Sequence, residues 1–312
     1  MNISIEGLSK TYGGGVQALK QIDLEIENGI FGLVGPNGAG KTTLMRILVT
    51  LMESTTGTVK FGDLDLRNDR RDIRAMLGYL PQQFSTFSKL KTWEFLDYSA
   101  RLSGLRDSRA RRGKIDELLE SVGLYEARDR LANKLSGGMK RRLGIAQALI
   151  GKPRILIVDE PTIGLDPEER LRFRNLMTDM IREEIIIILS THIVGDISSS
   201  CNRMTMLNKG EVVYDGSPDK LVAQAKGHVW RILAQEEELD SIKEKYPVVS
   251  TVPSEKGWEV QVVSEKPQGF NCESIEPNLE HAYVHFLEQN LGEKIDHALV
   301  DNGNGSDPFP ES

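Results

Sequence analysis

The stretch of sequence that decides the fold is Gly35-Pro36-Asn37-Gly38-Ala39-Gly40-Lys41-Thr42, followed directly by Thr43. It matches the pattern G-x-x-x-x-G-K-[ST], whose glycines let backbone N–H groups surround a phosphate. A short apolar run, residues 30–34, precedes the stretch, and apolar residues recur at helical spacing from Leu44 to Leu51. A strand, a glycine loop and a helix therefore occur in the order that a phosphate site requires, which predicts an α/β fold.

Two acidic residues follow a second buried strand. The apolar run 155–158 ends in Asp159 and Glu160. If this strand lies beside the first one, Asp159 reaches a Mg²⁺ ion and Glu160 reaches the water that attacks a γ-phosphate. From the loop we expect Lys41 to reach the β- and γ-phosphates and Thr42 to bind the same Mg²⁺. The two patterns together predict a site for a nucleoside triphosphate with Mg²⁺.

A third motif, Leu135-Ser136-Gly137-Gly138-Met139, lies between the other two and is followed by the basic run 140–142. A Ser-Gly-Gly turn that opens a helix can bind an anion, although taken alone it favours a simple helix cap, in which Ser136 accepts backbone N–H bonds. Placed between the glycine loop and the acidic strand, the motif resembles the signature of ABC-transporter ATPases. The resemblance covers residues 1 to about 220. It implies ATP as the nucleotide and a P-loop NTPase core with a mixed sheet and a helical subdomain.

Four further residues stand where that family has functional side chains, and only the resemblance implies their roles. Tyr12 resembles the aromatic residue that stacks on adenine. Gln82 resembles the glutamine that contacts the metal or the water and links the ATP core to the helical subdomain, and Gln83 beside it leaves the register open. Asp166 resembles the acid of a loop that crosses to a partner subunit, and His192 resembles the switch histidine that senses the γ-phosphate.

Met139 departs from the family pattern, because the fifth signature position more often holds Gln, whose amide can form hydrogen bonds. Methionine followed by a basic run resembles the branch of exporters that handle drugs and antibiotics, and the acidic C-terminal region resembles that branch too. The implied protein is an ATP-hydrolysing subunit that powers an ABC transporter, an exporter. It dimerises head to tail, as a homodimer, with each ATP between Lys41 of one copy and Ser136 of the other. Its second partner is a separate membrane-spanning permease.

Three alternatives stay open at this point. An importer ATPase would have the same mechanism with different membrane partners. A soluble ABC ATPase would act on ribosomes, DNA or Fe–S assembly, although such chains usually carry two cassettes or a long coiled-coil insertion. A regulatory module would bind ATP without turnover, and the presence of the hydrolytic residues argues against it.

Composition divides the chain near residue 225. From Lys226 onward there are 17 acidic and 7 basic residues, which leaves 29 acidic and 32 basic residues before it. We expect an ATPase domain over residues 1–225, with a helical subdomain at about 84–150, where strand patterns are absent. An acidic α+β appendage over residues 226–300 should follow. Residues 301–312 are rich in Gly, Asn, Pro and acid, so we expect them to be disordered.

The overall composition excludes several classes of protein. The net charge is −7, which argues against a nucleic-acid partner. No apolar stretch approaches the roughly 20 residues that cross a bilayer, and the first residues lack the features of a secretory signal. The 2 cysteines form no CxxC pair. We therefore expect a cytoplasmic protein that is peripheral on the inner face of the membrane through its permease.

Two smaller features have ordinary explanations. His281 and His285 stand four residues apart on a predicted helix, a spacing that could hold Zn²⁺, but we expect a solvated face. Basic residues gather between Arg101 and Lys114. Such runs are mostly solvated, and contact with an acidic partner or the anionic membrane leaflet is the alternative.

Overall fold

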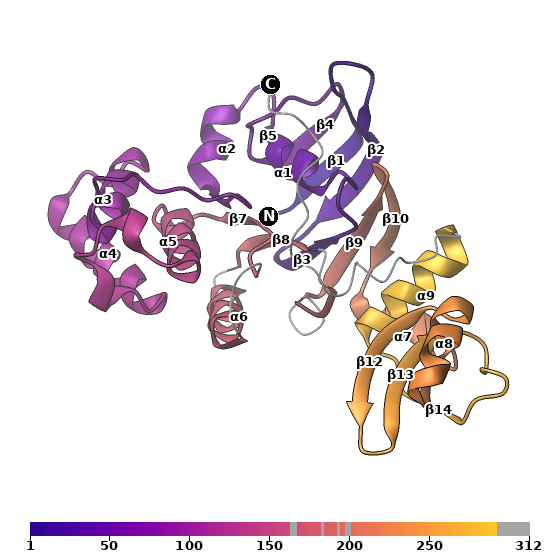
Figure 1. Cartoon of the computed structure of the whole chain (residues 1–312). Coiled ribbons are helices and arrows are strands. Elements are labelled where there is room, and N and C mark those ends of the chain that lie inside the picture. Colours follow the sequence, from indigo (N-terminus) through magenta and orange to yellow (C-terminus); the bar gives the residue numbers. More distant parts are fainter. Residues whose placement is uncertain (163–166, 182–183, 192–193, 197–200, 292–312) are drawn as a thin grey trace. The chain divides into compact units, whose positions relative to one another are not determined.

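A computed structural model of the chain describes residues 1–162, 167–181, 184–191, 194–196 and 201–291 (Figure 1). The chain divides into two compact units. The first comprises Met1–His192 and Ser200–Asp215, and the second comprises Ile193–Ser199 and Gly216–Ser312. The second unit thus begins before the change of charge near residue 225. Within the described ranges, no helix is both long and apolar enough to cross a membrane.

The described part of the first unit contains two sheets. An antiparallel sheet has the order β2-β1-β4-β5, formed by β1 (Ile3–Thr11), β2 (Gln17–Ile26), β4 (Thr56–Phe61) and β5 (Leu64–Asp65). The other sheet has the order β10-β9-β3-β8-β7-β6, formed by β3 (Gly29–Val34), β6 (Leu77–Leu80), β7 (Ile155–Asp159), β8 (Ile186–Thr191), β9 (Arg203–Asn208) and β10 (Glu211–Gly216). Its strands from β9 to β6 pair in parallel.

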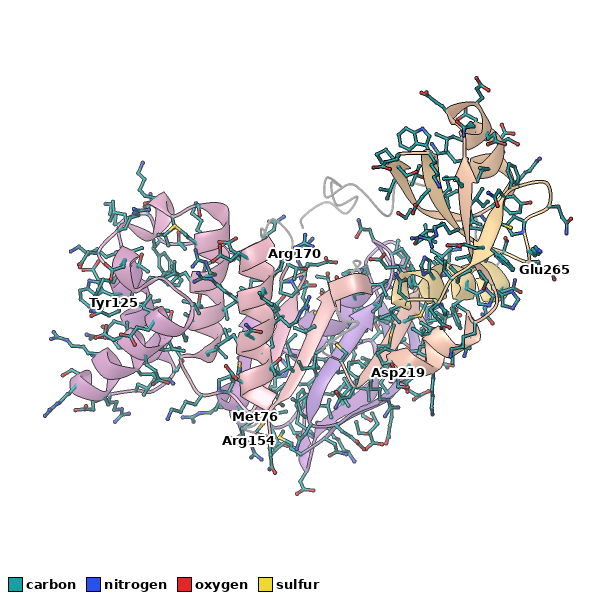
Figure 2. All side chains as sticks on the ribbon, turned by 90° about the horizontal axis from the view of Figure 1, so that it is seen from below. Met76, Tyr125, Arg154, Arg170, Asp219 and Glu265 are labelled. Carbon is teal, nitrogen blue, oxygen red and sulfur yellow. The ribbon has the colours of Figure 1, made fainter. Side chains whose placement is uncertain are left out.

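The parallel strands are buried because the sheet is covered on both faces. Every residue of β3, β7 and β8 is buried, as the continuous apolar runs predict. Alternate side chains such as Ile155 and Ile157 join β1, β2 and α1 (Lys41–Leu48) in one core. The register of β7 is fixed where Arg154 N donates to Met76 O (2.9 Å), and Figure 2 shows these two residues side by side. The strands predicted near residues 22–26, 30–34, 155–158 and 185–189 are confirmed.

Helices occupy the interval predicted to be helical, all of which the structure describes. They are α3 (Thr92–Leu102), α4 (Ser108–Ser121) and α5 (Gly137–Leu149), with no named strand among them (Figure 1). Arg111, 5 % exposed, ties α4 to α3 because its Nε donates to Asp97 Oδ1 (2.8 Å). The expectation of a solvated basic run is therefore wrong for Arg111, whereas Arg106, Arg109 and Arg112 are exposed. The remaining helices of this unit are α2 (Arg70–Met76) and α6 (Pro167–Ile181).

The second unit has its own sheet and core. Its antiparallel sheet has the order β12-β13-β11-β14, formed by β11 (Val229–Ala234), β12 (Val248–Ser254), β13 (Gly257–Val263) and β14 (Cys272–Ser274). Ile232, Val260 and Val262 pack with Ile242 in one apolar cluster. The helices are α7 (Pro218–Gln224), α8 (Leu239–Lys245) and α9 (Leu279–Leu291). The strands and the helix predicted near residues 229–232, 258–262 and 279–287 are confirmed.

The histidines of α9 do not form a solvated face. His281 is buried, its Nδ1 accepts a hydrogen bond from Asn278 N (3.1 Å), and Nε2 lies 2.8 Å from Gln261 Oε1. Because Nδ1 accepts, the ring proton sits on Nε2 and is donated to Gln261. Burial lowers the pKa of His281. His285 stacks on His228 instead, with ring centroids 4.7 Å apart, so the prediction of a solvated pair is wrong.

Candidate functional site

The carboxyl ends of four parallel strands meet at one edge of the six-stranded sheet. Val34 of β3 pairs with Thr191 of β8, and Asp159 of β7 pairs with Ser190 of β8. β6 ends beside β7 in the same way, directly before residues 81–82. Ligands of parallel sheets bind beyond this edge. The structure therefore brings the predicted phosphate loop and the predicted acidic pair together.

Two glycines of the phosphate loop occupy positions that admit no side chain. A Cβ at Gly35 would overlap Leu207 O, and one at Gly40, whose φ is 105°, would lie 2.6 Å from Ala18 O. Helix α1 begins at the next residue, Lys41, with neither a side-chain cap nor an acidic residue in its first turn. Its first N–H groups are therefore available to an anion.

Lys41 is a buried cation at this edge. Its side chain is 6 % exposed, and Nζ donates to Gly35 O (2.6 Å) and Pro36 O (3.1 Å). Nζ also lies 3.8 Å from Glu160 Oε1. Burial lowers the pKa of Lys41, while the carboxylates of Glu160 and Asp159 act to raise it. An ammonium group held by its own loop is placed to exchange these carbonyls for phosphate oxygens.

Asp159 offers a buried oxygen to a metal ion. Its Oδ1 accepts a hydrogen bond from Ser190 Oγ. Its Oδ2 is buried and has no hydrogen-bond partner in the described part of the chain. Burial raises the pKa of this carboxyl, and the nearby hydroxyls of Ser190 and Thr42 oppose the shift. Carboxylate and hydroxyl oxygens are ligands that Mg²⁺ prefers, so the residues present fit the predicted metal.

Glu160 has a backbone conformation that residues with a side chain rarely adopt. Its φ is 52°, and such strain persists only where the surroundings enforce it. The residue is buried, and its N–H donates to Ser190 Oγ (3.0 Å). The turn brings its carboxylate next to Lys41 Nζ, which places an acid–base group at the phosphate loop.

Arg141 of α5 also lies at this edge, although its sequence context indicates only a basic run. Its guanidinium donates to carbonyl oxygens on both sides of the site, including Gln82 O (3.0 Å) and Glu160 O (2.8 Å). Gln82 itself is exposed. The only sequence signal for Arg141 is its place among the apolar, buried positions of α5, such as Leu143 and Ile145.

The Ser-Gly-Gly turn lies exposed at the start of α5. Ser136 is the N-cap, and its Oγ accepts a hydrogen bond from Met139 N (3.2 Å). This cap is the one expected of the turn alone, and it is compatible with a functional role as well. A Cβ at Gly138 would overlap the Glu169 carboxylate of α6, whereas one at Gly137 would meet no atom of the described residues within 4 Å. The turn is therefore packed on one side and open on the other.

Tyr12 is held beside the helix that follows the phosphate loop. Its hydroxyl lies 3.0 Å from Thr43 Oγ1 and donates to Met52 Sδ (3.5 Å). Lys10 Nζ lies 5.6 Å from the centre of its ring.

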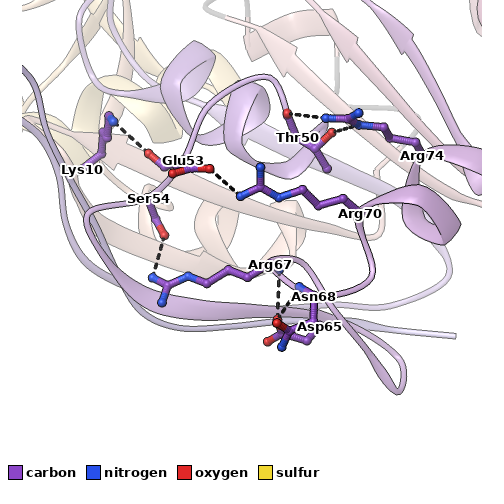
Figure 3. A network of polar contacts seen from close by, with 9 residues as sticks. All are labelled: Lys10, Thr50, Glu53, Ser54, Asp65, Arg67, Asn68, Arg70 and Arg74. Atoms are coloured by element: carbon purple, nitrogen blue, oxygen red, sulfur yellow. Dashed lines mark hydrogen bonds and ion pairs between the residues drawn. The ribbon is translucent and has the colours of Figure 1, made fainter.

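Polar contacts fix the loop that follows α1 (Figure 3). Lys10 and Arg70 contact Glu53, Arg67 contacts Ser54, and Arg74 contacts Thr50.

Asp166 and His192 lie outside the residues that the structure describes. Thr191, which precedes His192, ends β8 at the functional edge. Pro167, which follows Asp166, begins α6. The roles of both residues stay predictions.

Comparison with known proteins identifies the family. A family profile described as ABC transporter matches residues 19–163. A Bacillus subtilis (strain 168) protein named "Uncharacterized ABC transporter ATP-binding protein YxlF" is 38% identical over 251 residues, which are 80% of this chain and 82% of the relative. The chain belongs to the ABC transporter ATP-binding proteins. Family membership accounts for the phosphate loop, the acidic strand and the Ser-Gly-Gly turn in one chain.

Relatives of this ABC protein have names that refer to different processes, one to drug resistance and one to import. "Daunorubicin resistance ATP-binding protein DrrA3" of Streptomyces coeruleorubidus is 34% identical over 226 residues, covering 72% of this chain and 71% of the relative. "Phosphonates import ATP-binding protein PhnC 2" of Haloarcula marismortui is 35% identical over 243 residues, covering 73% and 89%. Among solved structures, a dimeric ATP-binding cassette bound to ADP and Pi is similar with a TM-score of 0.65 and 26% identity, covering 69% of this chain and 98% of that one.

Proposed function

We propose that the chain hydrolyses ATP to power an ABC transporter. The observation that carries the proposal is the buried group of Lys41, Asp159 and Glu160 at one edge of the sheet, directly beyond the glycine loop. A second carboxylate beside the phosphate site would only weaken ATP binding through repulsion. Hydrolysis does need such a carboxylate, because the attacking water must be oriented and its proton accepted.

The mechanism follows from these positions. Backbone N–H groups of the loop and of the first turn of α1 hold the phosphates, and Lys41 moves from its carbonyl partners to phosphate oxygens. Thr42 and Asp159 would hold Mg²⁺, and the bound ion would supply positive charge to the phosphate oxygens. Glu160 orients the attacking water and accepts its proton. Gln82 and His192, which follow β6 and β8, support the same water.

A head-to-tail dimer completes the site. The Ser136 turn is exposed and opens a helix, so the N–H groups of Gly137 and Gly138 can cover the ATP of a second copy. The contact with that copy that the family resemblance implies for Asp166 belongs to the same proposal. The similarity to a dimeric cassette with ADP and Pi supports this arrangement. Because one chain carries both Glu160 and the turn, a homodimer has two competent sites.

The transporter partner is a separate membrane-spanning permease that holds this subunit at the cytoplasmic face of the membrane, and the direction is export. Met139 and the daunorubicin-resistance relative favour export. The phosphonate-import relative keeps import as the second candidate. Copurification of the bound membrane protein, followed by its sequence, decides between the two directions. Copurification with ribosomes or DNA in its place would favour a soluble ABC ATPase.

Glu160→Gln tests the proposal directly. The variant should bind ATP at least as tightly as wild type, because the amide keeps the shape of the side chain and removes both the base and the charge that repels the phosphates. Turnover should fall by at least about 100-fold, the usual contribution of a general base, and ATP should trap a dimer that size-exclusion chromatography detects. Glu211→Gln, a change to an exposed carboxylate paired with Lys20, is the matched control. Unchanged hydrolysis in Glu160→Gln would refute the role of Glu160.

A further inference from the structure

Arg141 is a charged side chain inside the protein whose hydrogen-bond donors all serve the backbone. It is 7 % exposed, and a guanidinium carries five N–H donors in a rigid plane. Nε donates to Pro161 O (3.3 Å), and Nη1 donates to Pro81 O (2.7 Å) and Gln82 O (3.0 Å). Nη2 donates to Glu160 O (2.8 Å) and to the carbonyl of Asp159. One side chain thus holds five carbonyl groups.

These carbonyls belong to two segments that are distant in the sequence. Pro81 and Gln82 precede Arg141 by 60 and 59 residues, and residues 159–161 follow it by 18 to 20. The first segment leaves the end of β6 and the second leaves the end of β7, at the edge where the phosphate loop lies. Arg141 therefore joins the glutamine segment, the acidic pair and the helix that opens at Ser136.

The same contacts account for the strained backbone of Glu160. In an extended strand successive carbonyls point to opposite sides. Here the three consecutive carbonyls of residues 159–161 converge on one guanidinium, which requires the chain to turn between them. The left-handed φ of 52° at Glu160 makes that turn. The hydrogen bonds from Arg141 offset a conformation that is otherwise unfavourable.

The electrostatics agree with this arrangement. Burial lowers the pKa of Arg141 to about 10, with Asp159 and Glu160 acting in the opposite direction. The side chain thus stays protonated at neutral pH. Its charge lies behind the acidic pair, on the backbone side, and its donors are all engaged with carbonyls.

We propose that Arg141 is a positioning residue for hydrolysis: it fixes the carboxylate of Glu160 at the phosphate loop and keeps the Gln82 segment in the same frame. A movement of the helix that opens at Ser136 would consequently move Glu160 with it. The inference rests on the proposed function, since its main consequence is measured as ATP turnover. Arg141 acts through Glu160 and Gln82, without touching the nucleotide.

Arg141→Lys is the decisive variant, because lysine keeps the positive charge but its single ammonium cannot hold two segments in a planar fork. We expect kcat to fall about 10- to 100-fold, since small misplacements of a catalytic group have effects of this size. The KM and the Kd for ATP should stay within threefold of wild type. Hydrogen exchange, measured without nucleotide, should accelerate together at residues 82–84 and 160–162 and stay unchanged at residues 41–48.

Arg111→Lys is the matched control. Arg111 is similarly buried, and its guanidinium binds Asp97 together with the carbonyls of Leu105 and Arg106. All of these partners lie in the segment 97–111, away from the sheet edge. The control should lower the melting temperature by an amount similar to Arg141→Lys while leaving kcat unchanged. If Arg141→Lys does not fold, Arg141→Gln takes its place in the same measurements.

The outcomes separate this inference from the proposed function. If wild type turns over ATP and Arg141→Lys does so equally fast, the positioning role is overturned. Equal losses in kcat and in ATP affinity would also overturn it, because they indicate damage to the phosphate loop itself. If wild type shows no turnover, the proposed function fails. In that case unchanged exchange at either segment in the variant overturns the structural part of the inference as well.

Discussion

The two glycine turns of this chain have similar chemistry but differ in how far one chain completes them. The phosphate loop is enclosed: Gly35 admits no side chain, and Lys41 is buried against the acidic pair. The Ser136 turn is exposed, and Gly137 has open space around it. One chain therefore builds a nearly complete anion site at the loop and half of one at the turn. If this contrast is right, mutations at the loop should impair ATP binding, and mutations at the turn should impair turnover alone.

Lys41→Ala should produce the largest effect on the first side of the comparison. Loss of a charge-assisted contact with phosphate corresponds to about 1.5–3 kcal/mol, or roughly 10- to 100-fold in ATP affinity. Titration with a fluorescent ATP analogue measures the change. Lys20→Ala, at an exposed lysine that pairs with Glu211, is the control and should bind like wild type. Equal ATP binding by Lys41→Ala would break the assignment of the loop.

Gly137→Ala tests the turn. A Cβ there meets no atom within 4 Å among the described residues. Alanine is favoured over glycine by about 0.5–1 kcal/mol in the middle of a helix, and Gly137 is the first residue of α5, so thermal stability should be unchanged or slightly raised. ATP affinity of the monomer should stay the same. Turnover should nevertheless fall about 10-fold, because the methyl group would stand between the turn and the nucleotide of the partner copy. Wild-type turnover in this variant would show that the turn faces no nucleotide.

Substitution of Tyr12 should have the smallest effect on ATP binding. It tests the expected stacking of Tyr12 on adenine, next to the phosphate loop. Stacking of a base on an aromatic ring contributes about 1–3 kcal/mol, and Tyr12 is only half-buried, so we expect the lower end of this range. About 1–1.4 kcal/mol corresponds to ATP binding that is roughly 5- to 10-fold weaker in Tyr12→Ala. Tyr12→Phe keeps the ring and loses only the hydroxyl contacts with Thr43 and Met52, so it should bind within twofold of wild type. Isothermal titration calorimetry compares the two. Equal losses would assign the effect to the hydroxyl instead of the ring.

Local patterns were sufficient for the enclosed half of the site. The glycine loop is one continuous segment of the sequence, and the strand that ends in Asp159 is another. Each needs a defined order of residue types to form. The burial of β7 and β8 follows from continuous apolar runs. β1 and β4 were not predicted. Although β1 also pairs with the neighbouring β2, its pairing with β4 joins segments that lie far apart along the chain, such as Ile3 and Phe61.

Interactions between distant segments explain what the sequence could not show. From the sequence, Arg141 is only one member of a basic run. The carbonyl groups that it contacts belong to residues 59–60 positions earlier and 18–20 positions later, so the local sequence does not indicate that it is buried. His281 reads as solvated for the same reason, since Gln261 on β13 provides its partner. In both cases a polar side chain is buried through contacts with distant residues, and the periodicity of apolar residues does not predict such contacts.

The second unit includes a short segment that lies, in sequence, between the two parts of the first unit. Residues Ile193–Ser199, between β8 and β9, belong to it, and within them the segment Val194–Asp196 packs against α9. A Cβ at Gly195 would lie 2.8 Å from Glu280 Oε1 of that helix. A single cut after Asp215 would therefore leave this stretch behind without its support. Chimeras that exchange the C-terminal unit between relatives need three crossover points: one on each side of Ile193–Ser199 and one near Gly216.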